Sequence, residues 1–146
     1  MILRITIHDA PQGKGRPRFA RASGRTFTPA RTRAWEARAA TAVADALPPG
    51  WTPPRLAKLV VDAVFARPER LVCRHKRTCR CEADGLLGRL PHVVAPDADN
   101  VLKAVCDALE KGGAVSNDAV IWSATVRKWY ASPNEAPAVY VVLEAP

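Results

Sequence analysis

Short stretches in which apolar and polar residues alternate lie near both ends of the chain and in its middle. Residues 1–7 and residues 120–130 follow the two-residue period of a strand with one buried face. The β-branched run at 59–65 and the apolar run at 138–143 also have the length of strands. The pattern therefore predicts four strands, and the Ser-Pro-Asn sequence at 132–134 is expected to form the turn between the last two.

Two further segments have the period of helices that pack on a sheet. The first is the Ala-rich stretch 30–47, with Thr28 as its expected N-cap and Pro29 as its first helical residue. The second begins at Asp97 or Asp99 and ends at Gly112-Gly113. Its apolar stripe is formed by Val101, Leu102, Val105, Cys106, Ala108 and Leu109. The order β-α-β-α-β-β predicts one α/β (α+β) domain over residues 1–146, a mixed sheet with two helices packed on it.

Two segments lack periodicity and are expected to be loops. Residues 9–27 are rich in Gly, Pro and Arg, with Gly-Lys-Gly-Arg-Pro-Arg at 13–18. Residues 67–96 form a long, basic stretch that contains Cys73, Cys79 and Cys81. Loops of this length in a small domain are usually functional or mobile.

The composition narrows the class of protein. A chain of 146 residues with 48% hydrophobic and 25% charged residues is neither disordered, collagen-like nor a disulfide scaffold. No apolar run approaches the roughly 20 residues that span a bilayer. The first residues lack the apolar core and cleavage site of a signal peptide, so the expected location is the cytoplasm.

The charge is unevenly distributed along the chain. Lys and Arg number 22 against 14 Asp and Glu, giving a net charge of +8, and 16 of the cations are Arg. A GC-rich genome explains the Arg bias by itself equally well. Residues 1–38 carry nine cations and two acids, whereas residues 97–118 carry five acids and two cations. An acidic island within a basic protein is typical of a metal-dependent enzyme that acts on nucleic acid.

The acidic island contains the most informative spacing. Asp97 and Asp99 stand at the start of the second helix, Lys103 lies one turn beyond Asp99, and Asp118 follows the helix. Three carboxylates supply the oxygen ligands that Mg²⁺ prefers, and a nearby lysine counters charge on a phosphate or orients water. Spacing alone gives equal weight to a second interpretation, in which the aspartates only cap the helix and Lys103 only forms an ion pair.

The sequence Pro-Asp-Ala-Asp-Asn-Val-Leu-Lys-Ala-Val-Cys-Asp-Ala-Leu at 96–109, followed by Asn117-Asp118, resembles the RusA family of Holliday-junction resolvases, in particular its phage-borne branch. Asp97, Asp99 and Asp118 match the family's three catalytic carboxylates, and Lys103 matches its essential lysine. The resemblance implies a homodimer in a bacterial or phage-infected cell. It further implies Mg²⁺ (or Mn²⁺) dependence and nicking of two opposed strands of a four-way DNA junction in recombination and repair. The chain departs from the family pattern at Asn117, which replaces an acidic residue, and in the Cys-rich stretch.

Two groups of charged residues around this motif allow further predictions. Asp107 is expected to be structural, paired with Lys103 or Lys111, and is left outside the catalytic set. The loop residues Lys14, Arg16 and Arg18 are expected to contact the DNA backbone, with a merely solvated loop as the alternative.

The sequence also allows predictions for the cysteines and histidines, for Trp35 and for two apolar strand residues. Cys73, His75, Cys79 and Cys81, with His92 further on, have spacings unlike those of structural zinc sites, so reduced thiols in a basic loop are favoured over zinc. Cys106 and Trp35 are expected in the core. Val139 and Val141 are one candidate dimer interface.

Two other functions remain open at this point. One is a DNA-binding module without nuclease activity, and the other is a branch or flap nuclease of broader specificity. A requirement for Mg²⁺ separates the enzyme from the binding module.

Overall fold

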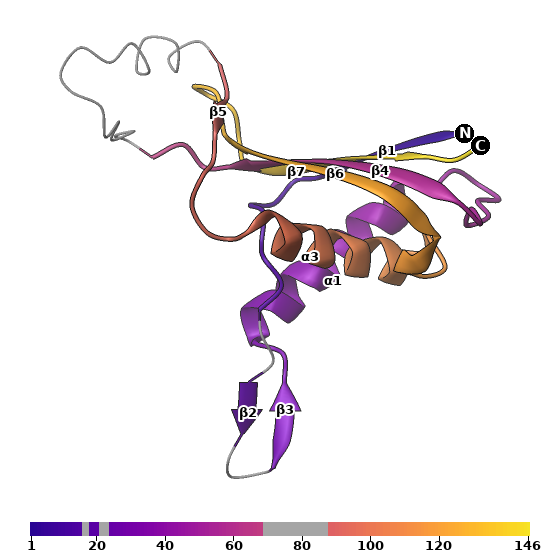
Figure 1. Ribbon diagram of the computed structural model, residues 1–146, viewed down its shortest axis with the longest axis horizontal. Coiled ribbons are helices and arrows are strands. Elements are labelled where there is room, and N and C mark those ends of the chain that lie inside the picture. Colours follow the sequence, from indigo (N-terminus) through magenta and orange to yellow (C-terminus); the bar gives the residue numbers. More distant parts are fainter. Residues whose placement is uncertain (16–17, 21–23, 69–87) are drawn as a thin grey trace.

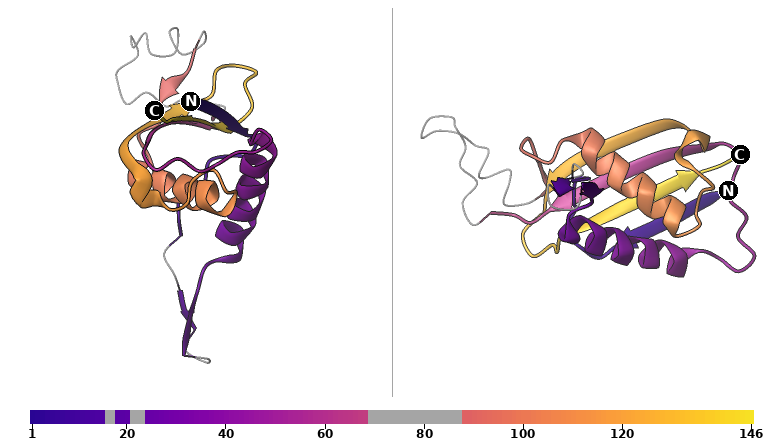
Figure 2. Two further views of the ribbon diagram at one scale, coloured as in Figure 1. Left: turned by 90° about the vertical axis from the view of Figure 1, so that its right-hand side faces the viewer. Right: turned by 90° about the horizontal axis from the view of Figure 1, so that it is seen from below.

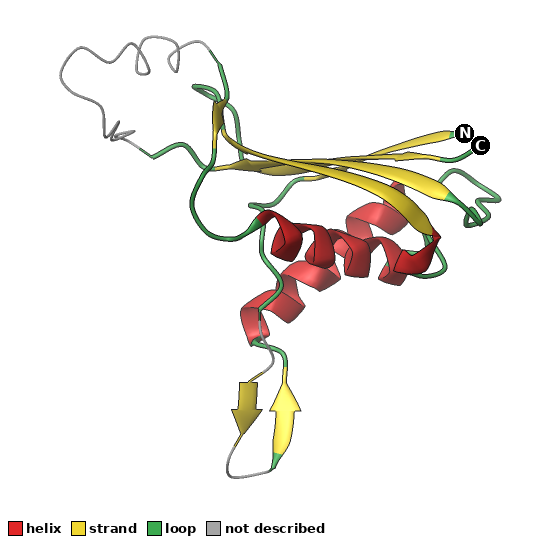
Figure 3. Cartoon of the chain, in the orientation of Figure 1, coloured by secondary structure: helices red, strands yellow, loops and turns green. Residues whose placement is uncertain are grey.

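The computed structural model describes residues 1–15, 18–20, 24–68 and 88–146 as a five-stranded sheet with two helices and a small hairpin (Figures 1 and 3). The elements are β1 (Ile2–Ile7), β2 (Arg18–Ala20), β3 (Arg25–Phe27), α1 (Ala30–Ala46), β4 (Ala57–Phe65), β5 (Leu90–Pro91), α3 (Ala98–Lys111), the 3-10 turn η1 (Asp118–Val120), β6 (Ile121–Tyr130) and β7 (Ala138–Glu144).

The sheet is mixed, with the strand order β1-β7-β4-β6-β5. β7 pairs antiparallel with both β1 and β4, β6 runs parallel to β4, and the short β5 pairs antiparallel with the end of β6. Both helices lie on the same face of the sheet (Figures 1 and 2). This arrangement confirms the predicted α+β class with two helices packed on a mixed sheet.

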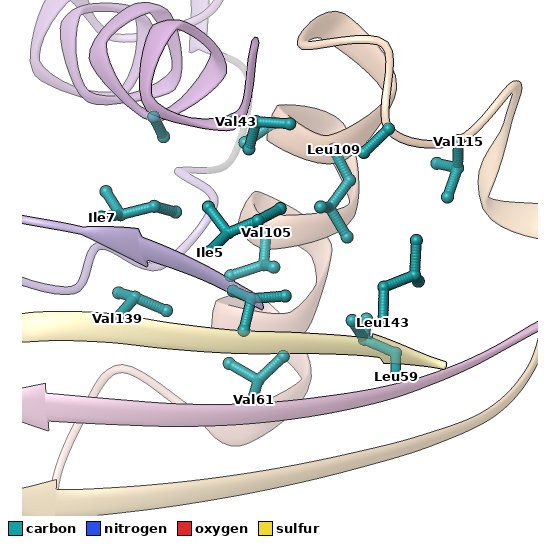
Figure 4. Packing of buried hydrophobic residues seen from close by; sticks show 14 of the residues in the cluster. Ile5, Ile7, Val43, Leu59, Val61, Val105, Leu109, Val115, Val139 and Leu143 are labelled. Carbon is teal, nitrogen blue, oxygen red and sulfur yellow. The ribbon is translucent and has the colours of Figure 1, made fainter. Parts of the chain in front are cut away.

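The core lies between the helices and the covered face of the sheet (Figure 4). Alternate residues of β1, β4 and β7 point inward, and α1 and α3 each contribute an apolar stripe that packs on them. Trp35 is 2% exposed, as its expected core position requires. On the opposite face of the sheet, Arg127 of β6 donates to Asp62 of β4 at 2.7 and 2.6 Å. One buried and one solvated face explain the alternation in the sequence.

The two helices are in close contact near the end of α3. Gly112 is the C-cap of α3, and a Cβ atom added there would lie 2.5 Å from Val43 of α1. Gly113 has a φ of +81°, which ends the helix as the sequence predicted. Close by, Lys111 donates to the buried carboxylate of Glu36 at 2.5 Å. Glycine at 112 is therefore required by packing and not by backbone conformation.

Several expectations about local structure are wrong. The segment 9–27 is not entirely a loop, because β2 and β3 form a short antiparallel hairpin within it. The segment 67–96 contains β5, and its residues 69–87 lie outside the described ranges. The N-cap position of α1 is Pro29 instead of Thr28, and it makes no side-chain capping bond.

No helix in the described ranges has the length and apolarity needed to cross a bilayer.

Val139 and Val141 are 0% and 1% exposed, so the expectation that they form an exposed apolar interface is wrong. They belong to β7, which lies inside the sheet between β1 and β4, and their side chains pack on the helices. The apolar run at the end of the chain reflects burial in the core.

Candidate functional site

The N-terminal turn of α3 presents two aspartates to solvent. Asp97 occupies the N-cap position, but its side chain makes no capping hydrogen bond, and Asp99 stands in the first turn. Both side chains are exposed. The interpretation in which Asp97 serves only as a helix cap therefore loses its main support, because the carboxylate oxygens remain available to a ligand.

Lys103 lies one turn further along the same face of α3. Its ammonium group is 3.3 Å from Asp99 Oδ2, and both side chains are more than half exposed. The hydrogen bond from Lys103 is the main reason why the pKa of Asp99 is lowered. The pair is a weak one because it is solvated, so Lys103 is free to turn towards another anion.

Asp118 lies beyond the opposite end of α3. The helix has 14 residues, so its two ends are separated by roughly 20 Å. Asp118 begins η1, and the preceding Asn117 caps that turn by accepting a hydrogen bond from the Ala119 amide at 3.0 Å. Among the described residues, no three His, Cys, Asp or Glu side chains gather closely enough to hold a metal ion. In a single chain, Asp97 and Asp99 thus share the start of α3, while Asp118 follows its end and lies near enough to Lys14 and Cys106 for its charge to act on them.

Asp107 has a different partner from the two that the sequence suggested. Its carboxylate lies 2.5 Å from the ammonium group of Lys14, while Lys103 pairs with Asp99 and Lys111 with Glu36. The hydrogen bond to Asp107 raises the pKa of Lys14. Asp107 therefore forms an ion pair with neither expected partner, and it joins α3 instead to the basic segment near the N-terminus (residues 13–18).

That basic segment is packed across the starts of both helices. The Lys14 amide donates to the Asn100 carbonyl at 3.0 Å, and a Cβ at Gly13 would lie 2.6 Å from Pro96. Gly15 approaches Thr32 of α1 in the same way. Beyond this contact the hairpin β2–β3 extends away from the helices and sheet (Figures 1 and 2).

The structure describes two of the three residues that were expected to contact DNA. Lys14 is engaged with Asp107, Arg16 lies outside the described residues, and Arg18 begins β2. Arg25, which starts the partner strand, is exposed. The hairpin therefore places Arg25 on the strand that pairs with β2, beside the basic segment.

Lys128 of β6 is a residue near the site that the sequence reasoning did not identify. Its ammonium group donates to the carbonyl oxygens of Val94 and Pro96, both at 2.7 Å, immediately before Asp97. The sequence contained one signal for it, since alternation along β6 places Lys128 on the helix-covered face, where a cation needs partners.

The candidate metal-ligating cysteines and histidines give no site in the described ranges. Cys73, His75, Cys79 and Cys81 lie outside those ranges. His92 is buried and stacks on the ring of Phe65 at 3.9 Å, and burial lowers its pKa. The last cysteine, Cys106, is partly buried against the core, and burial, aided by the charges of Asp118 and Asp107, raises its pKa to about 11. Cys106 is thus an unreactive packing residue.

The chain was compared with families of known proteins. A family model described as Endodeoxyribonuclease RusA matches residues 9–144, nearly the whole chain. No curated protein matches the chain significantly.

Proposed function

The chain belongs to the RusA family of endodeoxyribonucleases, and from this membership we propose that it resolves Holliday junctions in recombination and repair by nicking two opposed strands. The family match over residues 9–144 carries the proposal. Two exposed carboxylates support it, those of Asp97, which makes no capping hydrogen bond, and of Asp99, because a DNA-binding module would not need two acidic groups that repel a polyanion.

We propose that Asp97, Asp99 and Asp118 hold a divalent metal ion, Mg²⁺ or Mn²⁺, and that Lys103 acts beside them on the scissile phosphate. Clustered carboxylates suit Mg²⁺, which retains water molecules and accepts phosphate oxygens. Lys103 is one helical turn from Asp99 and weakly paired, so its ammonium group is available to oppose the negative charge of the phosphate.

The described residues of one chain do not bring three carboxylates close enough together to hold a metal ion, and Asp118 follows the end of α3 opposite to Asp97 and Asp99. A two-fold dimer resolves this difficulty. If α3 packs antiparallel against α3 of a second copy, the start of each helix meets the end of the other, and Asp118 of one chain approaches Asp97 and Asp99 of its partner. We propose such a homodimer, which has two equivalent sites for two opposed strands.

The open edge of β6 is a candidate part of the dimer interface. Among the described strands, only the short β5 pairs with this edge, at Tyr130 and Trp129, so the rest of β6 has no neighbour there. Trp122 of β6 is 66% exposed, which is unusual for a large aromatic side chain. Strand edges and exposed apolar residues of this kind favour association with a second chain.

DNA binding is assigned to the basic segment and its hairpin. We propose that Arg16, Arg18 and Arg25 contact phosphates, and that Lys14 contributes a weaker contact, since its charge is shared with Asp107. The projection of the hairpin beyond the body of the protein suits it to follow a DNA arm (Figure 2).

The central experiment compares a labelled four-way junction with a linear duplex of matched sequence, each with and without Mg²⁺. We expect paired nicks in the junction only, and only with the metal. Equal cleavage of flaps and junctions would instead indicate a branch nuclease of broader specificity. Binding without cleavage in Mg²⁺ and in Mn²⁺ would contradict the proposal.

A further inference from the structure

We propose that Lys128 is a positioning residue for the nuclease site: its ammonium group fixes the backbone of residues 94–96, and so sets where Asp97 and Asp99 stand at the start of α3. This inference rests on the proposed function of those two aspartates. It assigns no contact between Lys128 and DNA.

The contacts of Lys128 converge on one short segment. Its Nζ atom donates to the carbonyl oxygens of Val94 and Pro96 at 2.7 Å each, and its own carbonyl accepts from the His92 amide at 3.0 Å. Among the described residues, no carboxylate pairs with it. Hydrogen bonds from a charged donor are shorter and stronger than neutral ones, so this ammonium group holds the two carbonyls firmly.

The side chains of the segment that Lys128 holds do little to fix its backbone. Val93 and Val94 are 85% and 55% exposed, so burial fixes the backbone just before them, at His92, but not at these two residues. On its other side, Pro96 packs against Gly13. The approach to Asp97 is therefore held between Lys128 on β6 and the basic segment, and removal of the ammonium group leaves one of these two supports.

A neighbouring cation provides a natural control. Arg127 precedes Lys128 on β6, and successive side chains of a strand point to opposite faces. Arg127 pairs with Asp62 on the open face of the sheet, at 2.7 and 2.6 Å. Substitution of either residue by Met removes one positive charge from the same strand, but only the change at Lys128 releases the segment before Asp97.

The test compares Lys128→Met with Arg127→Met in two measurements. The first is single-turnover cleavage and binding of a four-way junction in Mg²⁺. We expect Lys128→Met to lose roughly 30- to 100-fold in cleavage rate, because displaced catalytic groups cost about this much, while its Kd for the junction stays within threefold. Arg127→Met is expected to retain the wild-type rate.

The second measurement is hydrogen exchange of the free protein. Peptides that cover residues 93–99 should exchange at least tenfold faster in Lys128→Met than in Arg127→Met, while the middle of α3 keeps its protection. This readout does not depend on activity. If the wild-type protein fails to cut any junction, the proposed function is wrong, and the exchange data still decide whether Lys128 holds the segment.

Two results would overturn the inference. Unchanged exchange over residues 93–99 in Lys128→Met would show that the clamp does not hold the segment. A weaker Kd with a salt slope reduced by about 0.9 would show that Lys128 contacts a phosphate instead. Should the Met variant fail to fold, Lys128→Gln retains N–H donors at that position, and it must show intermediate losses in both measurements or the inference fails.

Discussion

The two ends of α3 carry acidic residues that belong to one predicted motif, but the chain treats these ends differently. At the start, Asp97 and Asp99 are exposed, and the backbone before them is held by polar contacts from Lys128. At the end, Gly112 is packed so closely on α1 that a Cβ does not fit. The start of the helix therefore presents exposed carboxylates, whereas its end contributes to the packing of the fold, and the proposed three-carboxylate site has to combine residues from both ends.

The largest effect is expected when a carboxylate at one end of α3 is substituted in one chain and a carboxylate at the other end in a second chain. Asp99→Asn and Asp118→Asn should each reduce cleavage more than roughly 100-fold, by loss of a metal ligand. In the proposed dimer, a mixed dimer of these two variants has one site with both substitutions and one intact site. Coexpression should therefore restore nicking to about a quarter of the wild-type level per chain.

The matched control for this experiment is coexpression of Asp97→Asn with Asp99→Asn. Both changes lie at the same end of α3, so every mixed dimer has two damaged sites and should remain inactive. If Asp99→Asn and Asp118→Asn also fail to complement, although both variants fold and dimerise, the shared site is wrong.

The next largest effect concerns the packed end. Gly112→Ala should lower the free energy of unfolding by about 1–3 kcal/mol, because the new methyl group overlaps Val43 and the Ala40 carbonyl. Urea denaturation measures this loss, and cleavage per folded molecule should stay unchanged. Gly88→Ala is the control, since no atom of the described residues lies within 4 Å of a Cβ at that glycine. Equal stability of the two variants would show that the helices do not meet as closely as described.

A smaller effect is expected for the pair between Lys14 and Asp107. The two side chains are 40% and 28% exposed, so their coupling should not exceed about 1 kcal/mol. A double-mutant cycle with Lys14→Met and Asp107→Asn, followed by urea denaturation, measures it. A coupling of zero would mean that the ammonium group is available to DNA in full, and would strengthen the original expectation for Lys14.

The smallest effect concerns electrostatics at the start of α3. Lys103→Met should raise the pKa of Asp99 towards its ordinary value, because it removes the hydrogen bond that lowers this pKa. A lowered folded-state pKa gives stability that is present above the ordinary value and is lost as pH falls through the folded value. The Lys103→Met variant should therefore lose this small dependence of folding stability on pH in the acidic range. A carbon-detected NMR titration measures the shift, with Lys111→Met, which acts at the other end of the helix, as the control.

The sequence predicted the main elements of the fold because their apolar periods are strong. The strand alternation of residues 120–130 and the stripe of α3 each survive in the structure with their ends moved by one or two residues. The prediction from sequence failed where contacts between residues distant in the chain determine which side chains are buried. Val139 and Val141 read as exposed strand residues, since no local signal indicates that β7 enters the sheet between β1 and β4.

The residues of the candidate site can be chosen from the sequence, but their arrangement in space cannot. The spacing of Asp97, Asp99 and Lys103 determines their common helical turn, as a local motif should. The position of Asp118 depends on the length of α3 and on the chain that follows it, and this separation is invisible to a motif. The hydrogen bonds of Lys128 were equally hidden, because they join segments more than 30 residues apart.

The place of β7 in the sheet has a consequence for biosynthesis. This strand comes last among the elements described, yet β1 and β4 pair with it from either side, so residues 2–7 must wait for residues 138–144 before the sheet can close. Pairings this distant in sequence are slow to form. At a synthesis rate of roughly 5–20 residues per second, a nascent chain spends several seconds with both helices made and no continuous sheet to pack on. The complete five-stranded sheet therefore closes only after translation has passed β7.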